Sequence, residues 1–145
     1  MACQAETLPY YENRVEIDEN NKDKWGFPML KITAAYRENE MLMRKDIKQQ
    51  VGEILEVAGL RDINLYESKP IFGDTIHEMG TARMGRDPKT SVLNGYNQCH
   101  DIPNLFITDG SCMVSSGNAS PSLTYMALTA RACDYAVNQM KKGEI

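Results

Sequence analysis

Apolar and polar positions alternate along the first part of the chain and predict a β-hairpin. Residues 13–18, with the sequence NRVEID, are expected to form a short strand, and the Asn-, Asp- and Gly-rich residues 18–26 a polar turn. The return strand is expected over residues 27–36, where Pro28 lies at the start and is tolerated. The pattern therefore predicts two antiparallel strands.

The spacing of apolar residues changes after residue 38, and from there to residue 58 they recur at helical spacing. Gly59 supplies the expected end of this helix. We expect one face of the helix to lie on the sheet and the other to face solvent. The apolar residues of the first face are Ile47, Val51, Ile54, Leu55 and Ala58.

Shorter segments follow. Residues 63–69, INLYESK, predict another strand, and the many glycines of residues 73–95 predict mainly loop. A loop of this length inside a compact domain usually carries function or covers something. Residues 102–110, IPNLFITDG, predict a buried strand that stops at the Asp-Gly pair.

A second amphipathic helix is expected from Pro121 to about residue 140. Ser120 is a preferred N-cap residue, and proline is a preferred first helical residue. The apolar residues that lie on one face of the second helix are Leu123, Met126, Ala127, Ala130, Cys133 and Val137.

Charge and composition exclude some classes of function. The 145 residues carry a net charge of −4, and basic and acidic residues are interleaved. The sequence therefore has no stripe of basic residues that would indicate nucleic-acid binding. No segment is long and apolar enough to span a bilayer, and the N-terminus MACQAETLPYY lacks the features of a signal peptide. We expect a cytoplasmic location for the sequence as it stands, or a periplasmic one if a signal precedes it.

The four cysteines and two histidines are the next candidates for chemistry. Cys3, Cys99, Cys112 and Cys133 show no CxxC spacing, so free thiols are expected and no metal site is predicted. The less favoured alternative is a metal bound by Cys99, His100 and Cys112. His100 is expected to be an exposed turn residue beside Asp101.

Three other positions each allow two interpretations. His77 opens HEMGTARMG (77–85), and the pattern alone slightly favours a structural histidine bonded to a loop carbonyl over a catalytic one. Asp109-Gly110 fits either a plain turn or the edge of a nucleotide site. Ser120 is explained by helix capping, although a helix N-terminus also stabilises anions.

In this order and spacing, HEMGTARMG, DIPNLFITDGS and SPSLTYMALTARACDYAV resemble the C-terminal part of the glucose-methanol-choline (GMC) oxidoreductases. The upstream stretches LPYYENRVEID and DKWGFPMLKI also resemble that family, so the likeness covers about residues 8–140. Each motif alone is weak, but the ordered set is specific.

The resemblance implies an α+β fold for this region, an antiparallel sheet with packed helices, joined to an α/β FAD-binding domain. It also implies a flavoenzyme that oxidises an alcohol, sugar or polyol by hydride transfer to FAD. His77 matches the motif histidine that lies beside the substrate hydroxyl and acts as a base. Asp109 and Gly110 match the segment that contacts FAD. The final helix would aim its N-terminus, with the expected cofactor contacts Pro121, Leu123 and Thr124, at the pyrimidine side of the flavin, where its dipole stabilises negative charge.

The resemblance also implies a division of the chain. Residues 1–101 would form the substrate-binding region with the histidine loop, and residues 102–145 a strand and helix that complete the FAD-binding domain. No Gly-x-Gly-x-x-Gly follows a strand, so the N-terminal Rossmann-like FAD-binding part is expected to be absent from these 145 residues. The expected partners are that missing domain, an alcohol or sugar, and oxygen, a quinone or a cytochrome as electron acceptor.

One position departs from the family pattern. The second catalytic residue is usually Asn followed by Pro, or His, whereas Ser120 precedes Pro121 here. A serine hydroxyl can still donate one hydrogen bond to substrate, and Asn118 would compensate only if the loop is rearranged.

Three hypotheses follow from this comparison. The leading one is the C-terminal portion of a FAD-dependent oxidoreductase, inactive as an isolated chain. The alternatives are a non-catalytic remnant that serves as a sugar-binding or interaction module, and a truncated product that self-associates through an exposed apolar face.

Overall fold

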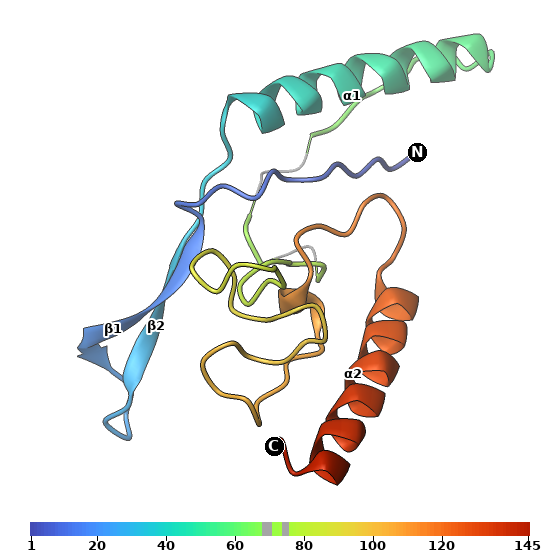
Figure 1. Ribbon diagram of the computed structural model, residues 1–145. Helices are drawn as coiled ribbons and strands as arrows, with labels where there is room; N and C mark the ends of the chain where they lie inside the picture. The colour runs from blue at the N-terminus through green and yellow to red at the C-terminus, as the bar shows by residue number, and fades with distance from the viewer. Residues whose placement is uncertain (68–70, 74–75) are drawn as a thin grey trace. The chain divides into compact units, whose positions relative to one another are not determined.

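The computed structural model describes residues 1–67, 71–73 and 76–145. The chain divides into two compact units, Met1–Asp74 and Thr75–Ile145, and each is described by itself. The first contains a β-hairpin and helix α1, and the second contains irregular loops and helix α2 (Figure 1).

The predicted hairpin is confirmed. Strand β1 (Arg14–Lys22) pairs antiparallel with β2 (Pro28–Thr33). Val15 faces Ile32 and Ile17 faces Leu30 across the strands, so these four apolar side chains share one face of the sheet. All four are at least 39% exposed, so that face has no cover among the described residues.

The turn between the strands is organised by Asp23. Its carboxylate accepts hydrogen bonds from the main-chain N–H groups of Trp25 and Phe27, each at 2.9 Å. Gly26 adopts φ +91°, a left-handed conformation that glycine supplies at little cost. The turn presents the Trp25 ring, 72% exposed, to solvent.

Helix α1 (Glu38–Val57) is confirmed, and Gly59 follows it with φ +83° as expected for a helix end. Glu40 is buried near its start, and its carboxylate accepts hydrogen bonds from the N–H groups of Leu8 and Arg37 and from the Tyr10 hydroxyl. Burial raises the pKa of Glu40, but the hydrogen bonds outweigh it and lower the pKa to about 2. This ionised carboxylate fastens the N-terminal segment to the helix.

The expected packing of α1 on the sheet is wrong. The helix instead contacts the chain that follows it: a Cβ on Gly52 would lie 3.3 Å from Leu65, and Arg44 Nε lies 2.7 Å from a Glu67 carboxylate oxygen. The strand predicted over residues 63–69 is not formed in its described part, residues 63–67, and the remainder falls outside the described residues. An extended segment lying along a helix has no neighbouring strand to pair with.

The second unit is built from short irregular segments, which confirms the loop expected in the described part of residues 73–95. Isolated bridges pair Met84 with Leu93, Leu93 with Cys99, and Gln98 with Phe106. The side chains of Leu93, Cys99 and Cys112 form the buried cluster of this unit. The buried strand predicted over residues 102–110 is wrong, since this segment forms only the bridge at Phe106 and its apolar residues are exposed or half-buried.

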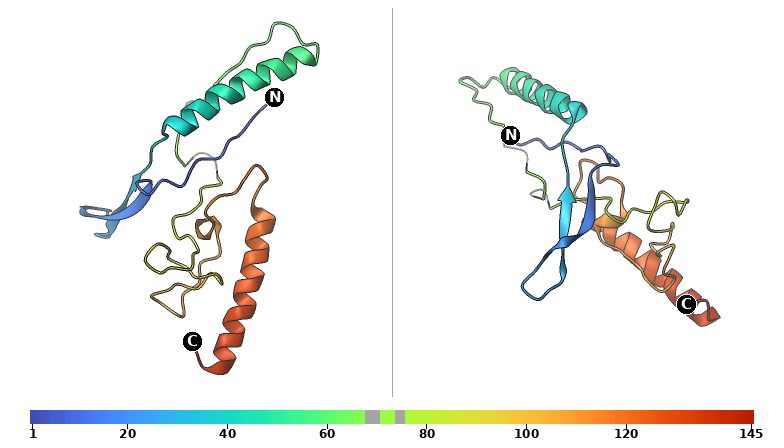
Figure 2. Two further views of the ribbon diagram at one scale, coloured as in Figure 1. Left: turned by 45° about the horizontal axis from the view of Figure 1, so that its top comes forward. Right: turned by 90° about the vertical axis from the view of Figure 1, so that its left-hand side faces the viewer.

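Helix α2 (Ser122–Lys142) runs alongside these segments, as both views of Figure 2 show. Leu128 packs against the buried cluster, Ala132 is buried, and the Tyr135 ring stacks on Tyr96 with centroids 4.2 Å apart. Within this unit the helix turns the side that carries Tyr125 and Tyr135 toward the loops. The apolar residues of the predicted face are exposed: Leu123, Met126, Ala127, Ala130, Cys133 and Val137.

The antiparallel sheet and two long helices confirm the α+β class. The expected division after residue 101 stays a prediction. Within the described part of the chain, no helix combines the length and apolar character required to cross a membrane.

Candidate functional site

The loop that carries His77 lies against the turn that carries Asp109. The N–H of Ala82 donates to the Ser111 carbonyl at 3.0 Å, and the N–H of Met84 donates to the Cys112 carbonyl at 2.9 Å. Gly80, with φ +88°, lets the loop turn just before this pairing. Residues 76–85 and 109–112 are therefore fixed side by side, with His77 half-buried.

Asp109 caps a short 3-10 turn, η1 (Gly110–Cys112). One of its carboxylate oxygens accepts hydrogen bonds from the Ser111 N–H, at 2.8 Å, and from the Ser111 hydroxyl. The residue is exposed, so its carboxylate both stabilises the turn and remains accessible from solvent.

Gly110 is the point at which three sequence motifs meet. A Cβ added to this residue would lie 2.8 Å from the Tyr125 hydroxyl, 3.1 Å from the Glu78 carbonyl oxygen and 3.2 Å from the Met79 sulfur. The first distance is shorter than any ordinary carbon contact. Glycine is required here because the histidine loop and helix α2 approach the main chain so closely.

Tyr125 is a site residue that the sequence analysis missed. Its hydroxyl lies 3.7 Å from the Met79 sulfur and beside Gly110. Burial raises the pKa of Tyr125, and the negative charges of Asp109 and Glu78 raise it further. The hydroxyl therefore stays protonated. The sequence gives little indication that Tyr125 belongs to a site, because a tyrosine in an amphipathic helix usually indicates only packing.

The start of α2 differs from the prediction. The N-cap is Pro121, with φ −85° and ψ 0°, and no side chain donates or accepts a capping bond there. The N-cap prediction for Ser120 is therefore wrong: the proline takes the N-cap position itself, and Ser120 lies one residue outside the helix. Ser120 and Asn118 are both exposed, whereas Pro121 is buried.

The first turn of α2 is therefore open at its N-terminus. Ser122, Leu123 and Thr124 are exposed in this turn. Main-chain N–H groups at a helix start have no partner within the helix and carry partial positive charge. Without a capping side chain, these groups are available to an acceptor on a ligand.

His100 is not the exposed turn residue that the sequence predicted. It is half-buried, and its Nε2 lies 3.1 Å from Ser91 Oγ and 3.3 Å from the Gly85 carbonyl oxygen. Ser91 Oγ also donates to the Asp87 carbonyl at 2.7 Å. A hydroxyl has one hydrogen, so the histidine must donate from Nε2, and the residue serves to fix the loop.

Gly85 shows why this loop admits no larger residue at its end. A Cβ on Gly85 would lie 2.6 Å from Ser91 Cβ and 2.8 Å from Ser91 Oγ. The final glycine of HEMGTARMG is thus a packing requirement, imposed by the segment that His100 holds in place.

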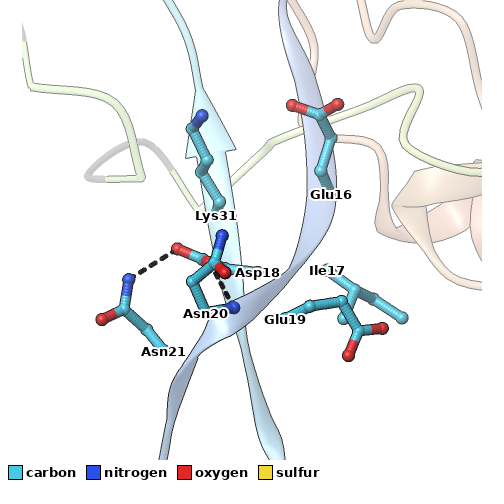
Figure 3. A pocket seen from close by; sticks show the side chains of 7 residues that line it. All are labelled: Glu16, Ile17, Asp18, Glu19, Asn20, Asn21 and Lys31. Atoms are coloured by element: carbon cyan, nitrogen blue, oxygen red, sulfur yellow. Dashed lines mark hydrogen bonds between the residues drawn. The ribbon is translucent and has the colours of Figure 1, made fainter.

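A pocket on the hairpin contains none of the predicted site residues (Figure 3). In it, Asp18 accepts hydrogen bonds from the Asn21 side chain, at 2.8 Å, and from the Asn20 N–H, at 3.0 Å. These two bonds lower the pKa of Asp18. The residues that line the pocket are Glu16, Ile17, Asp18, Glu19, Asn20, Asn21 and Lys31.

The cysteines are all free thiols. Cys3 and Cys133 are exposed, and Cys99 and Cys112 are buried in the second unit. Among the described residues, no group of three or more His, Cys, Asp or Glu side chains is arranged to hold a metal ion.

Known proteins share this sequence pattern. Residues 9–129 match the family described as GMC oxidoreductase. The 2-methyl-1,2-propanediol dehydrogenase of Mycolicibacterium austroafricanum is 34% identical over 134 residues, which are 90% of this chain and 24% of that protein. The fructose dehydrogenase large subunit of Gluconobacter japonicus is 33% identical over 138 residues, 95% of this chain and 25% of that protein.

A cholesterol oxidase of Acinetobacter baumannii matches a shorter stretch, with 36% identity over 61 residues. The chain spans about a quarter of the length of the first two relatives. The family match covers most of the chain, including the histidine loop, the Asp-Gly turn and the start of α2. The chain therefore belongs to the GMC oxidoreductase family.

Proposed function

We propose that the chain is the C-terminal portion of a FAD-dependent oxidoreductase that oxidises the CH–OH group of an alcohol, sugar or polyol. The observation that carries the proposal is the meeting of three family motifs at Gly110, where the histidine loop and helix α2 both approach the main chain. Family membership supplies the reaction class. The isolated chain is expected to be inactive.

The residues around Gly110 fit a flavin on physical grounds. The Asp109 carboxylate is exposed, and the start of α2 has no capping side chain. These groups suit a ligand with hydroxyl donors and electron-rich acceptors. We propose that Asp109, Gly110, Pro121, Leu123 and Thr124 contact FAD.

Each residue has a role in this scheme. Bound FAD would accept the hydride from the substrate carbon. His77, as a neutral imidazole, removes the hydroxyl proton, because a more negative oxygen makes hydride departure easier. The N-terminus of α2 directs partial positive charge toward the developing negative charge, and thereby stabilises the transition state more than the ground state.

Ser120 is proposed to donate a hydrogen bond to the substrate oxygen. It is exposed and lies outside the helix, and the helix start receives no side-chain cap. Capping therefore does not compete for its hydroxyl. Asn118, also exposed in the same segment, is the alternative donor.

The division of the chain is part of the proposal. Residues 1–101 would form the substrate-binding region, and residues 102–145 would complete the FAD-binding domain, whose remaining part is the expected partner. The uncovered apolar face of α2, with Leu123, Met126 and Val137 each at least 48% exposed, supports this division. The electron acceptor would be oxygen, a quinone or a cytochrome, and the location cytoplasmic or periplasmic.

The test replaces His77 with Ala in the intact enzyme. Flavin reduction by substrate, followed anaerobically by absorbance, should slow by about 10²- to 10⁴-fold, the usual contribution of a positioned base. The matched control is His100→Ala: this histidine fixes the end of the same loop through Ser91 and the Gly85 carbonyl, so its loss should slow the reduction far less than the loss of His77. Unchanged reduction in the His77 variant would remove this residue from the mechanism, and an intact enzyme without flavin would remove the reaction class.

A second candidate function is a non-catalytic binding module. The observation that favours it is Ser120 in the position where the family usually has Asn or His. Ser120→Asn distinguishes the two candidates. A faster flavin reduction supports a weakened enzyme, whereas no turnover in either form supports the module.

A further inference from the structure

Asn97 is the most completely enclosed polar residue near the proposed flavin site. Its exposure is 0%, and its main chain has φ +64°. Asparagine is among the few residues other than glycine that tolerate this left-handed conformation. Its N–H donates to the Asn94 carbonyl at 3.1 Å, which closes a tight turn.

Both main-chain polar groups of Ile107 are bonded to this one residue. The Asn97 side-chain amide donates to the Ile107 carbonyl at 2.9 Å, and the Ile107 N–H donates to the Asn97 carbonyl at 3.0 Å. Ile107 precedes Asp109 by two residues. Asn97 therefore holds the segment that leads into the Asp109-Gly110 turn, and it does so from the solvent-excluded side of that segment.

The same amide also reaches helix α2. Its Oδ1 accepts a hydrogen bond from the Arg131 guanidinium at 3.5 Å. One side chain thus joins the segment before the turn to the helix whose N-terminus would face the proposed cofactor.

We propose that Asn97 is a positioning residue that sets the Asp109-Gly110 turn against helix α2 for FAD binding. The inference rests on the proposed function, since it assigns a purpose to the geometry of that same site. Asn97 is fully enclosed, so it would act through Ile107 and Arg131 and make no contact with the cofactor. It differs from a residue that only stabilises the fold, because its loss should change the FAD dissociation rate and the flavin midpoint potential as well as the stability.

The neighbouring amide provides a matched control. Gln98 is also buried, and its side chain donates to the Pro103 carbonyl at 2.7 Å and accepts from Asn94 at 2.9 Å and from the Tyr135 hydroxyl at 3.3 Å. These bonds fix the turn to the later part of α2. None of them involves Ile107. Replacing Gln98 should therefore remove a buried hydrogen-bond network of similar size but leave the segment that leads to Asp109-Gly110 in place.

The experiment compares Asn97→Gly and Gln98→Ala in the intact enzyme. Glycine keeps the left-handed main chain and removes only the amide. Both variants should lower Tm, but only Asn97→Gly should increase the FAD dissociation rate, by about tenfold for the loss of one buried hydrogen bond, and shift the flavin midpoint potential. Asn97→Asp, which keeps the size but opposes the Ile107 carbonyl with an acceptor, should act in the same direction if the glycine variant does not fold.

Two results would overturn the inference. One is a folded Asn97 variant with the FAD dissociation rate and potential of the wild type. The other is an equal change in both properties in the Gln98 variant, which would reduce Asn97 to a general stabilising residue. A wild-type intact enzyme that binds no flavin would instead refute the proposed function.

Discussion

The hydroxyl oxygen of Tyr125 lies 2.8 Å from the position that a Cβ atom on Gly110 would occupy. The helix and the Asp-Gly turn are therefore in contact with no space for an additional methyl group. This relationship makes residues 110 and 125 interdependent, although they belong to different segments.

Substitution at both positions tests this dependence. Gly110→Ala should lower the free energy of unfolding by about 1–3 kcal/mol, the usual cost of overpacking. Tyr125→Phe removes the nearest atom and should restore part of the loss, leaving the contact with the Glu78 carbonyl at 3.1 Å. Urea unfolding of the two single variants and the double variant measures the coupling, and strictly additive losses would contradict a direct contact.

Glu40 should make the stability of the first unit depend on pH. Its pKa falls from 4.5 to about 2 on folding, so its contribution is complete above pH 4.5 and is lost as the pH falls toward 2. We expect Glu40→Gln to lower stability at pH 7 by about 2 kcal/mol and to remove this acid-dependent part. Unfolding free energies between pH 2 and pH 7 provide the measurement.

The control for that experiment is Glu12→Gln. Glu12 forms an exposed ion pair with Arg37 at 2.9 Å, of a kind that contributes less than about 1 kcal/mol. If both variants show the same pH profile as the wild type, the buried carboxylate does not fasten the N-terminal segment.

The imidazole of His100 should carry a proton on Nε2. Ser91 uses its hydrogen on the Asp87 carbonyl and can only accept from the imidazole. Long-range proton–nitrogen correlation spectra at neutral pH would identify the tautomer. Ser91→Ala should cost about 1 kcal/mol of stability, while the exposed Ser115→Ala should cost nothing measurable. A dominant Nδ1-protonated form would contradict the assignment.

Trp25 should behave as a tryptophan in water. It is the only tryptophan of the chain, and its ring is 72% exposed at the hairpin turn. Its fluorescence should be quenched by acrylamide nearly as efficiently in the folded chain as in the urea-unfolded chain. Weak quenching and blue-shifted emission in the folded chain would show that another surface covers the turn.

Local patterns predicted the elements whose form depends on local sequence. The hairpin and α1 follow from alternation, helical spacing and the turn residues around Gly26 and Gly59, and the structure has them within a few residues of the expected bounds. The expected strands at residues 63–69 and 102–110 failed because apolar content alone does not supply a pairing partner.

The candidate site was only partly accessible to sequence reasoning. The motifs around His77, Asp109 and Pro121 marked segments that the structure brings together, but their meeting at Gly110 depends on contacts between residues far apart in the chain. Tyr125 and Asn97 were not predicted for the same reason. A tyrosine in an amphipathic helix and an asparagine in a turn are common in sequences, and only their burial and long-range contacts distinguish these two residues.

The exposed face of α2 also contains a chemical handle. Cys133 lies between Ala130 and Val137 on that face, and its thiol is exposed, whereas Cys99 and Cys112 are enclosed. With Cys3 replaced by Ser, a thiol-reactive dye should attach at this one accessible site. Because the dye would sit opposite the packed Tyr135 side of the helix, it would sense an approaching protein surface without disturbing the core.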